Sequence, residues 1–227
     1  MAISNETRSR VKAIFEPIAL AMGRLGLSPD ALTLIGFAIT AAGAALLAAQ
    51  LWLAGGIVVF LGGAFDMFDG TLARATGKVS KLGAFMDSVF DRWGEALVYV
   101  GIVWGCVAGE FALGALLAAA AMASAFLVSY ARAKSEGLGF TAGTGMAAVG
   151  LAPREIRLVV LSVGLVAAGV AGGVAGPAGA AWSDLSAGRA WLALALGLIA
   201  LAATATVVQR ILHVRAQARG GGPGPIA

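Results

Sequence analysis

The chain has 227 residues, of which 59% are hydrophobic and 12% are charged, and its mean hydropathy is +0.90. An average soluble domain carries about 25% charged residues, so this composition excludes an ordinary water-soluble enzyme. One cysteine and one histidine exclude an intrachain disulfide and a Cys/His zinc cluster. The histidine, His213, lies in a basic segment far from any suitable serine and aspartate signature, so a Ser/His/Asp hydrolase is not expected.

Four stretches without Asp, Glu, Lys or Arg are long enough to cross a bilayer. They cover 31–65, 111–131, 158–183 and 190–209, which are 35, 21, 26 and 20 residues long. A helix needs about 20 apolar residues to cross a hydrocarbon core about 30 Å thick. The chain is therefore expected to be an integral membrane protein.

The predicted fold is all-α. Residues 1–28 interleave basic and apolar side chains, which is typical of an amphipathic juxtamembrane helix on the membrane surface. Six membrane-spanning helices follow at about 31–51, 53–75, 82–108, 111–133, 155–176 and 190–212. We expect a single transmembrane domain over residues 1–219, followed by a flexible, Gly/Pro-rich tail at 220–227.

The distribution of Lys and Arg predicts the orientation of these spans. With the N-terminus inside, 14 of the 16 Lys and Arg residues fall in cytoplasmic segments, while Arg189 falls outside and Arg92 within a span. Short cytoplasmic loops hold the excess of basic residues in membrane proteins. We therefore expect a multi-pass protein of the cell membrane with both termini in the cytoplasm. The Gly/Thr-rich loop 134–153 is then inside, and the loop 172–188 is outside.

Four aspartates lie within the second and third predicted spans, where an ionisable group is costly. At 100° per residue Asp66 and Asp69 lie about 60° apart on one helix, and Asp87 and Asp91 follow one face of the next. The four carboxylates can converge between the two helices, where they would repel one another unless cations intervened. Oxygen ligands favour Mg²⁺ or Mn²⁺, and two ions would balance the four charges. Two such metals suit the clamping of a phosphoryl group.

The aspartates also allow two other interpretations. They could lie near helix ends and pair with Lys81, Arg74 and Arg92, although this does not suit their geometry or number. They could instead line the path of a divalent-cation or solute transporter. A transporter would need polar residues continuing toward the outer face, and the first, fifth and sixth spans offer almost none.

The segment from Asp66 to Asp91 resembles the signature of the CDP-alcohol phosphotransferases, D-x-x-D-G-x-x-A-R-x8-G-x-x-x-D-x-x-x-D. It reads Asp66-Met-Phe-Asp-Gly-Thr-Leu-Ala-Arg74, eight residues, and then Gly83-Ala-Phe-Met-Asp-Ser-Val-Phe-Asp91, so that every fixed position matches. The family architecture, six helices after a juxtamembrane helix, fits the whole chain.

This resemblance implies a reaction in which a CDP-linked lipid, CDP-diacylglycerol or CDP-archaeol, reacts with an alcohol to give a phosphodiester lipid and CMP. It implies that Asp66, Asp69, Asp87 and Asp91 hold two divalent ions and that Asp91 is the general base. The residues implied to contact the CDP-lipid are Pro29, Asp30, Ala31, Leu32, Gly70, Arg74 and Ser80. It also suggests a homodimer, among membrane lipids and without a nucleic-acid partner.

Some of these residues have other possible roles. Gly70 and Gly83 leave backbone bare for a bulky phosphate, but either glycine could simply allow close helix packing. Asp30 replaces the Asn that is usual in the family, and it could instead be the N-cap of the first span.

Basic residues at the cytoplasmic helix ends indicate an acceptor that carries its own phosphate. The expected acceptor-binding residues are Ser129, Arg132, Arg154, Arg157 and Arg210. The sequence Asp87-Ser-Val-Phe-Asp91-Arg92 departs from the Asp-Pro-x-Ala-Asp-Lys associated with phosphatidylglycerophosphate synthases. It is similar to that of phosphatidylinositol-phosphate and archaetidylinositol-phosphate synthases. Inositol 1-phosphate is thus the expected acceptor, and glycerol 3-phosphate is the alternative.

Overall fold

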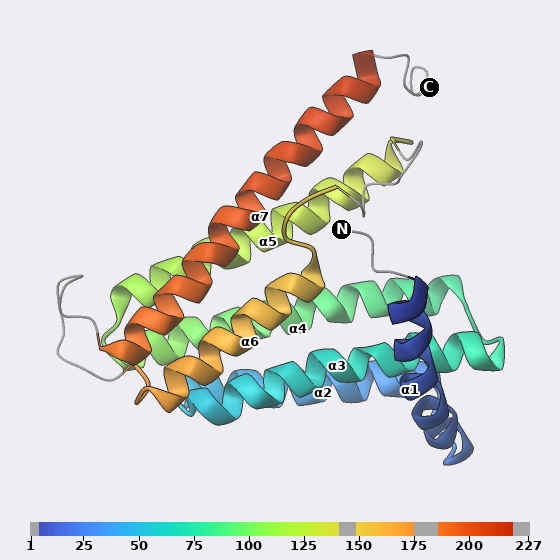
Figure 1. Ribbon diagram of the computed structural model, residues 1–227, viewed down its shortest axis with the longest axis horizontal. Coiled ribbons are helices and arrows are strands. Elements are labelled where there is room, and N and C mark those ends of the chain that lie inside the picture. Colours follow the sequence, from blue (N-terminus) through green and yellow to red (C-terminus); the bar gives the residue numbers. More distant parts are fainter. Residues whose placement is uncertain (1–4, 141–148, 175–185, 220–227) are drawn as a thin grey trace.

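The structure is a computed structural model that describes residues 5–140, 149–174 and 186–219, with side chains from residue 15 onward (Figure 1). These residues form helices and no strand, which confirms the all-α prediction. The helices are α1 (Asn5–Arg24), α2 (Pro29–Ala48), α3 (Trp52–Thr76), α4 (Lys81–Ala108), α5 (Ala112–Gly137), α6 (Arg154–Val170) and α7 (Ala187–Arg219). The predicted tail at 220–227 and parts of the predicted loops 134–153 and 172–188 lie outside the described residues.

Four of these helices, α2, α3, α5 and α7, are long and apolar enough to cross a membrane. The chain is therefore a helical membrane protein. Among the described residues, α4 and α6 do not meet the same criterion, because α4 carries several charges in its first half and α6 has only 17 residues. The number of six spans stays a prediction.

Several helix ends differ from the predicted ones by a few residues, and α2 ends at Ala48 instead of residue 51. Helix α5 continues beyond residue 133 to Gly137, and its last turns contain an ion pair between Arg132 and Glu136 at 2.9 Å. Helix α7 extends past residue 212 to Arg219. Helix α6 ends at Val170, before residue 176, because Gly172 and Gly173 adopt positive φ angles of 93° and 76°.

A tight connection turns the chain between α3 and α4. Gly77 ends α3 with a φ of 67°, a left-handed conformation that favours glycine. Ser80 then caps α4, because its hydroxyl accepts a hydrogen bond from the Gly83 N–H at 2.9 Å. The two halves of the Asp66–Asp91 signature therefore lie on two consecutive helices.

Helix α2 begins with a similar cap, but not with the residue considered for it. The Ser28 hydroxyl accepts a hydrogen bond from the Ala31 N–H at 3.1 Å, so Ser28 is the N-cap. The interpretation of Asp30 as the N-cap was wrong, because Asp30 already lies within the first turn. A carboxylate there interacts favourably with the helix dipole.

Small residues bring α2 and α4 close together. A side-chain Cβ at Gly101 would overlap the carbonyl oxygen of Ala44, and one at Gly105 would overlap that of Leu47. Close backbone approach through small residues is the usual way in which membrane helices associate. Cys106 of α4 is fully buried, and a Cβ at Gly114 of α5 would lie 2.9 Å from its sulfur, as expected of a packing residue.

Arg189 was predicted to lie in an outer segment, and it is buried in the first turn of α7. Its Nε donates a hydrogen bond to the Val174 carbonyl at 2.7 Å, and its Nη2 donates one to the Gly109 carbonyl at 2.9 Å. The guanidinium also lies 5.2 Å from the centre of the Phe111 ring, a distance typical of a cation–π contact. Arg189 thus joins α7 to the chain segments that follow α4 and α6.

Candidate active site

Polar residues of six helices gather on one side of the molecule. They come from the first turns of α2 and α6, the first half of α4, the last turns of α5, and the second halves of α3 and α7. Because successive helices run in opposite directions, these parts of the helices face the same side of the molecule, where the ends of α5 and α7 diverge from α2, α3 and α4 (Figure 1). The site is therefore built from residues that are far apart in the sequence.

Asp69 is the most buried aspartate of the signature, with 6% of its surface exposed. The Thr33 hydroxyl of α2 donates a hydrogen bond to Asp69 Oδ2 at 2.5 Å. The Gly70 N–H donates one to the other carboxylate oxygen. These contacts fix the orientation of the carboxylate from two helices.

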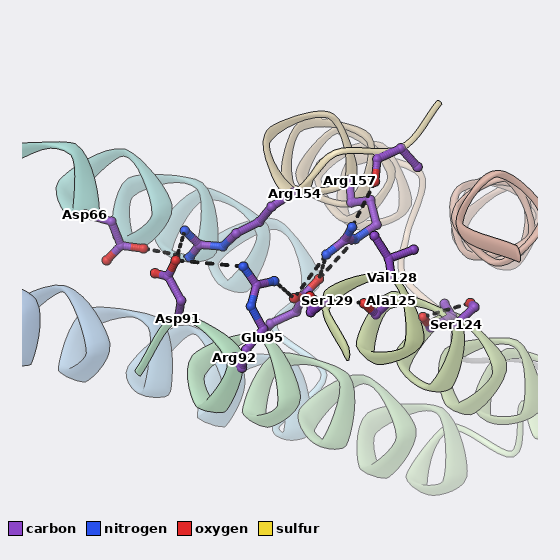
Figure 2. Close-up of polar contacts among 12 residues, drawn as sticks. Asp66, Asp91, Arg92, Glu95, Ser124, Ala125, Val128, Ser129, Arg154 and Arg157 are labelled. Atoms are coloured by element: carbon purple, nitrogen blue, oxygen red, sulfur yellow. Dashed lines mark hydrogen bonds and ion pairs between the residues drawn. The ribbon is translucent and has the colours of Figure 1, made fainter. Parts of the chain in front are cut away.

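Asp66 of α3 and Asp91 of α4 share one guanidinium. Arg154, the first residue of α6, has its Nη2 2.7 Å from Asp66 Oδ2 and its Nη1 2.7 Å from Asp91 Oδ2. Figure 2 shows the arginine between the two carboxylates. The arginine supplies the positive charge that adjacent carboxylates require.

A second set of ion pairs lies one helical turn further along α4 and α6. Glu95 of α4 accepts hydrogen bonds from Arg157 of α6, with Arg157 Nη2 3.0 Å from Glu95 Oε1. Arg92 Nη1 lies 2.7 Å from the other oxygen, Oε2 (Figure 2). Arg157 and Glu95 are respectively 3% and 12% exposed, so this pair is largely shielded from water.

A cavity of about 270 Å³ lies between α2, α3 and α4. Five of the residues expected to contact the CDP-lipid line it, namely Pro29, Asp30, Gly70, Arg74 and Ser80. Asp69, Asp87 and Lys78 line it as well. We call it the donor cavity.

Ala31 and Leu32, which were also expected to contact the CDP-lipid, do not line the donor cavity. Leu32 is fully buried in an apolar cluster with Ala19 and Leu72. Ala31 contributes its N–H to the Ser28 cap. These two residues position α2 beside the cavity.

A larger cavity, of about 790 Å³, opens between α4, α5, α6 and α7. It is lined by all five expected acceptor-binding residues, Ser129, Arg132, Arg154, Arg157 and Arg210, and also by Asp91 and Arg92. We call it the acceptor cavity. Asp87 lines both cavities, so the two meet at this aspartate.

The residues of the acceptor cavity differ in the freedom of their side chains. Arg210 is 5% exposed and donates hydrogen bonds to the Val149 carbonyl, at 3.1 Å, and to the Val128 carbonyl. Arg132 is exposed and paired with Glu136. The Ser129 hydroxyl donates a hydrogen bond within α5, to the Ala125 carbonyl at 3.4 Å.

The four aspartates suit a hard divalent cation, because each of them would bind the metal through carboxylate oxygens. Within the described part of the chain, no three acidic, histidine or cysteine side chains are already gathered as a metal site. Arg154 lies between Asp66 and Asp91, where it provides positive charge. Asp66, Asp69, Asp87 and Asp91 are the residues that could hold a metal.

A family model described as CDP-alcohol phosphatidyltransferase matches residues 27–213, which include both cavities. The chain belongs to this family. It is therefore a CDP-alcohol phosphatidyltransferase, and the resemblance noted for residues 66–91 is confirmed.

Named relatives of this phosphatidyltransferase agree with the assignment. It is 36% identical over 160 residues to archaetidylinositol phosphate synthase of Pyrococcus horikoshii, covering 70% of this chain and 80% of that protein. It is 32% identical over 221 residues to phosphatidylinositol phosphate synthase of Streptomyces avermitilis, covering 94% and 82%.

Crystal structures of phosphatidylinositol phosphate synthase from Mycobacterium tuberculosis share the fold of this phosphatidyltransferase. The structure with CDP-DAG bound has a TM-score of 0.74 and 28% identity, covering 95% of this chain and 99% of that one. The structure in complex with manganese and citrate has the same TM-score and identity, covering 94% and 93%.

Sequence reasoning missed three residues of this phosphatidyltransferase site. Thr33 directly follows the expected CDP-lipid contacts Pro29, Asp30, Ala31 and Leu32, and this position was the available signal for a role beside Asp69. Lys78 lines the donor cavity, and Arg92 lines the acceptor cavity. Lys78 lies in the eight-residue spacer of the signature and Arg92 directly follows the signature, and their positive charge was the only signal.

Proposed function

We propose that the enzyme transfers a phosphatidyl-type group from a CDP-linked lipid to inositol 1-phosphate and releases CMP. The observation that carries this proposal is the meeting of two polar cavities at Asp87. One cavity is lined by signature residues that suit a pyrophosphate, and the other by arginines that suit a phosphorylated alcohol. The names of the relatives support the choice of acceptor.

The donor cavity has the features that a nucleotide diphosphate needs. Arg74 and Lys78 can neutralise phosphate oxygens. A Cβ at Gly70 would lie 3.3 Å from Arg74 Nη1, and one at Gly83 would lie 3.1 Å from Ser80 Oγ. Both glycines therefore keep open space that a side chain would fill.

The proposed cofactor is Mg²⁺ or Mn²⁺, with two ions per active site, held by Asp66, Asp69, Asp87 and Asp91. Two divalent ions would balance the charge of four carboxylates. The manganese complex of the Mycobacterium tuberculosis relative supports this choice. When bound, such ions would polarise the phosphoryl oxygens and stabilise the charge of the leaving group.

Asp91 is the proposed general base, because it lines the acceptor cavity beside the arginines. The acceptor phosphate binds the arginines and brings its hydroxyl group to Asp91. The hydroxyl proton passes to the carboxylate while the oxygen forms a bond to the lipid-bearing phosphorus. The pyrophosphate bridge breaks at that phosphorus, and CMP leaves with the bonding electrons.

We further propose six spans, with α4 and α6 crossing the cell membrane and both termini and the active site on the cytoplasmic side. The alternating helix directions, which bring the polar ends together, support this topology. In single-cysteine variants built on Cys106→Ala, a membrane-impermeant maleimide should label Leu51→Cys from outside. It should label Lys134→Cys only after permeabilisation. The reverse pattern would contradict the topology.

The proposed assembly is a homodimer surrounded by membrane lipids. Its support is the family resemblance, together with many large apolar side chains exposed on the membrane-spanning helices. Cross-linking in native membranes followed by mass measurement tests it. A species of twice the chain mass is expected, and a monomer throughout would contradict it.

The acceptor is tested by measuring CMP release from CDP-diacylglycerol with purified enzyme, Mg²⁺ and one alcohol at a time. Release is expected with inositol 1-phosphate and not with unphosphorylated inositol, which lacks the group that the arginines bind. Release with glycerol 3-phosphate alone would overturn the choice of acceptor. Metal uptake into proteoliposomes without any CMP release would favour the transporter interpretation.

A further inference from the structure

Glu95 lies outside the signature, one turn beyond Asp91 on α4, and contacts two arginines at once. Its Oε1 accepts hydrogen bonds from Arg157 Nη2 at 3.0 Å and Arg157 Nε at 3.2 Å. Its Oε2 accepts one from Arg92 Nη1 at 2.7 Å. Figure 2 shows the carboxylate between the two guanidinium groups.

Both arginines line the acceptor cavity, and they reach it from different helices. Arg157 is also fixed by a hydrogen bond from Nη1 to the Ala152 carbonyl at 2.8 Å. Because Arg157 is buried, its side chain has few other conformations available. Arg92 is 28% exposed, and Glu95 is the nearer of its two acidic partners, since Asp91 Oδ2 lies 3.9 Å away.

The charges explain why a carboxylate is needed at this point. Two guanidinium groups that approach the same site repel each other, and a single carboxylate with two oxygens can pair with both. Arg92, Arg157 and Glu95 together carry a net charge of +1, which attracts an anionic ligand. Arginines that are held in place before binding lose less conformational freedom when the ligand arrives.

We propose that Glu95 is a positioning residue that holds Arg92 and Arg157 for the phosphate of the acceptor alcohol. This inference rests on the proposed function, because it takes the cavity of about 790 Å³ as the acceptor site. Glu95 itself touches neither the reacting atoms nor the donor cavity. It acts on acceptor binding through the two arginines.

The test is Glu95→Gln, with KM measured separately for the acceptor and for the CDP-lipid. Glutamine carries no negative charge, and its NH₂ group takes the place of one accepting oxygen, so it forms an ion pair with neither arginine and turns a donor toward one of them. The acceptor KM should rise about tenfold, while the KM for CDP-lipid stays within about twofold of the wild-type value. A parallel rise in both KM values, or none in the acceptor KM, would overturn the proposal.

Glu155→Gln is the matched control. Glu155 lies beside the same cavity, is exposed on the first turn of α6 and has no ion pair with another described residue. Its substitution removes the same charge without releasing an arginine. An increase in acceptor KM equal to that of Glu95→Gln would mean that net charge, and not positioning, is responsible, and would contradict the proposal.

Loss of a buried partner can prevent folding, so Glu95→Asp is the second variant. It keeps the charge but withdraws the carboxylate by one methylene, and it should weaken calorimetric binding of inositol 1-phosphate several-fold. Unchanged binding would overturn the proposal. If the wild type uses only glycerol 3-phosphate, the proposed acceptor is wrong, and the same comparisons are made with that phosphate.

Discussion

At the scale of single residues, Asp69 depends on a hydroxyl group from another helix for its orientation. Thr33 donates to it at 2.5 Å from α2, 36 residues away in the sequence. A carboxylate held at both oxygens is ready to bind a metal without first losing side-chain freedom. Thr33 therefore contributes to the proposed metal site although it lies outside the signature.

Thr33→Val should lower kcat about tenfold, because the near-isosteric valine cannot orient Asp69. The measurement is CMP release at saturating CDP-lipid and acceptor over a range of Mg²⁺ concentrations, and more Mg²⁺ should be required. Thr204→Val on α7 removes a hydroxyl that bonds only within its own helix, and it serves as control. Equal kinetics for the two variants would show that the Thr33 contact has no role.

Gly83→Ala should raise the KM for CDP-lipid about tenfold and leave the acceptor KM unchanged. The new methyl group would lie 3.1 Å from Ser80 Oγ and 3.6 Å from Asp30 Oδ1, within the donor cavity. Gly197→Ala is the control, because a Cβ there meets no atom within 4 Å. A normal KM for CDP-lipid in Gly83→Ala would place the nucleotide elsewhere.

At the scale of helices, arginines join elements at both ends of the bundle. Arg154 connects α6 to α3 and α4 at the aspartates, and Arg189 joins α7 to the segments after α4 and α6. Glycine contacts bring α2 and α4 together between these ends. We expect substitution of Arg189 to change the stability of the fold, and substitution of Arg154 to change its response to Mg²⁺.

Arg189→Met should lower the free energy of unfolding by about 2 kcal/mol, because two buried carbonyls lose charge-assisted hydrogen bonds. Thermal unfolding in detergent measures the loss. Both KM values should stay normal, since Gly109 lies just after the far end of α4, about 27 Å along the helix axis from Asp91. The exposed Arg215→Met is the control, and an equal loss in both variants would contradict a structural role for Arg189.

Arg154→Gln should increase the stabilisation of the fold by Mg²⁺. In the wild type Arg154 supplies positive charge to Asp66 and Asp91, and without it the four carboxylates have a greater need for divalent ions. The measurement is the rise in Tm on addition of Mg²⁺, compared with that of Arg132→Gln. A smaller rise in Arg154→Gln than in the wild type would contradict this view of the ion pairs.

At the scale of the whole molecule, the features that depend on periodicity and local spacing could be predicted from the sequence. The apolar runs gave the helices, and the spacing from Asp66 to Asp91 located the aspartates on two neighbouring helices. Contacts between distant segments could not be predicted in this way. Glu95 and Arg157 are 62 residues apart, and Arg189 and Gly109 are 80 apart, so only the packing of the helices brings them together.

The central claim is that a CDP-lipid in the donor cavity reacts with an alcohol in the acceptor cavity beside the aspartates, and that Asp91 is the base. The most direct measurement compares Asp91→Asn with the wild type for CMP release in the presence of inositol 1-phosphate and for binding of CDP-diacylglycerol. We expect the variant to lose CMP release by at least a factor of about 100 while binding CDP-diacylglycerol. An Asp91→Asn enzyme that releases CMP at the wild-type rate would contradict the account.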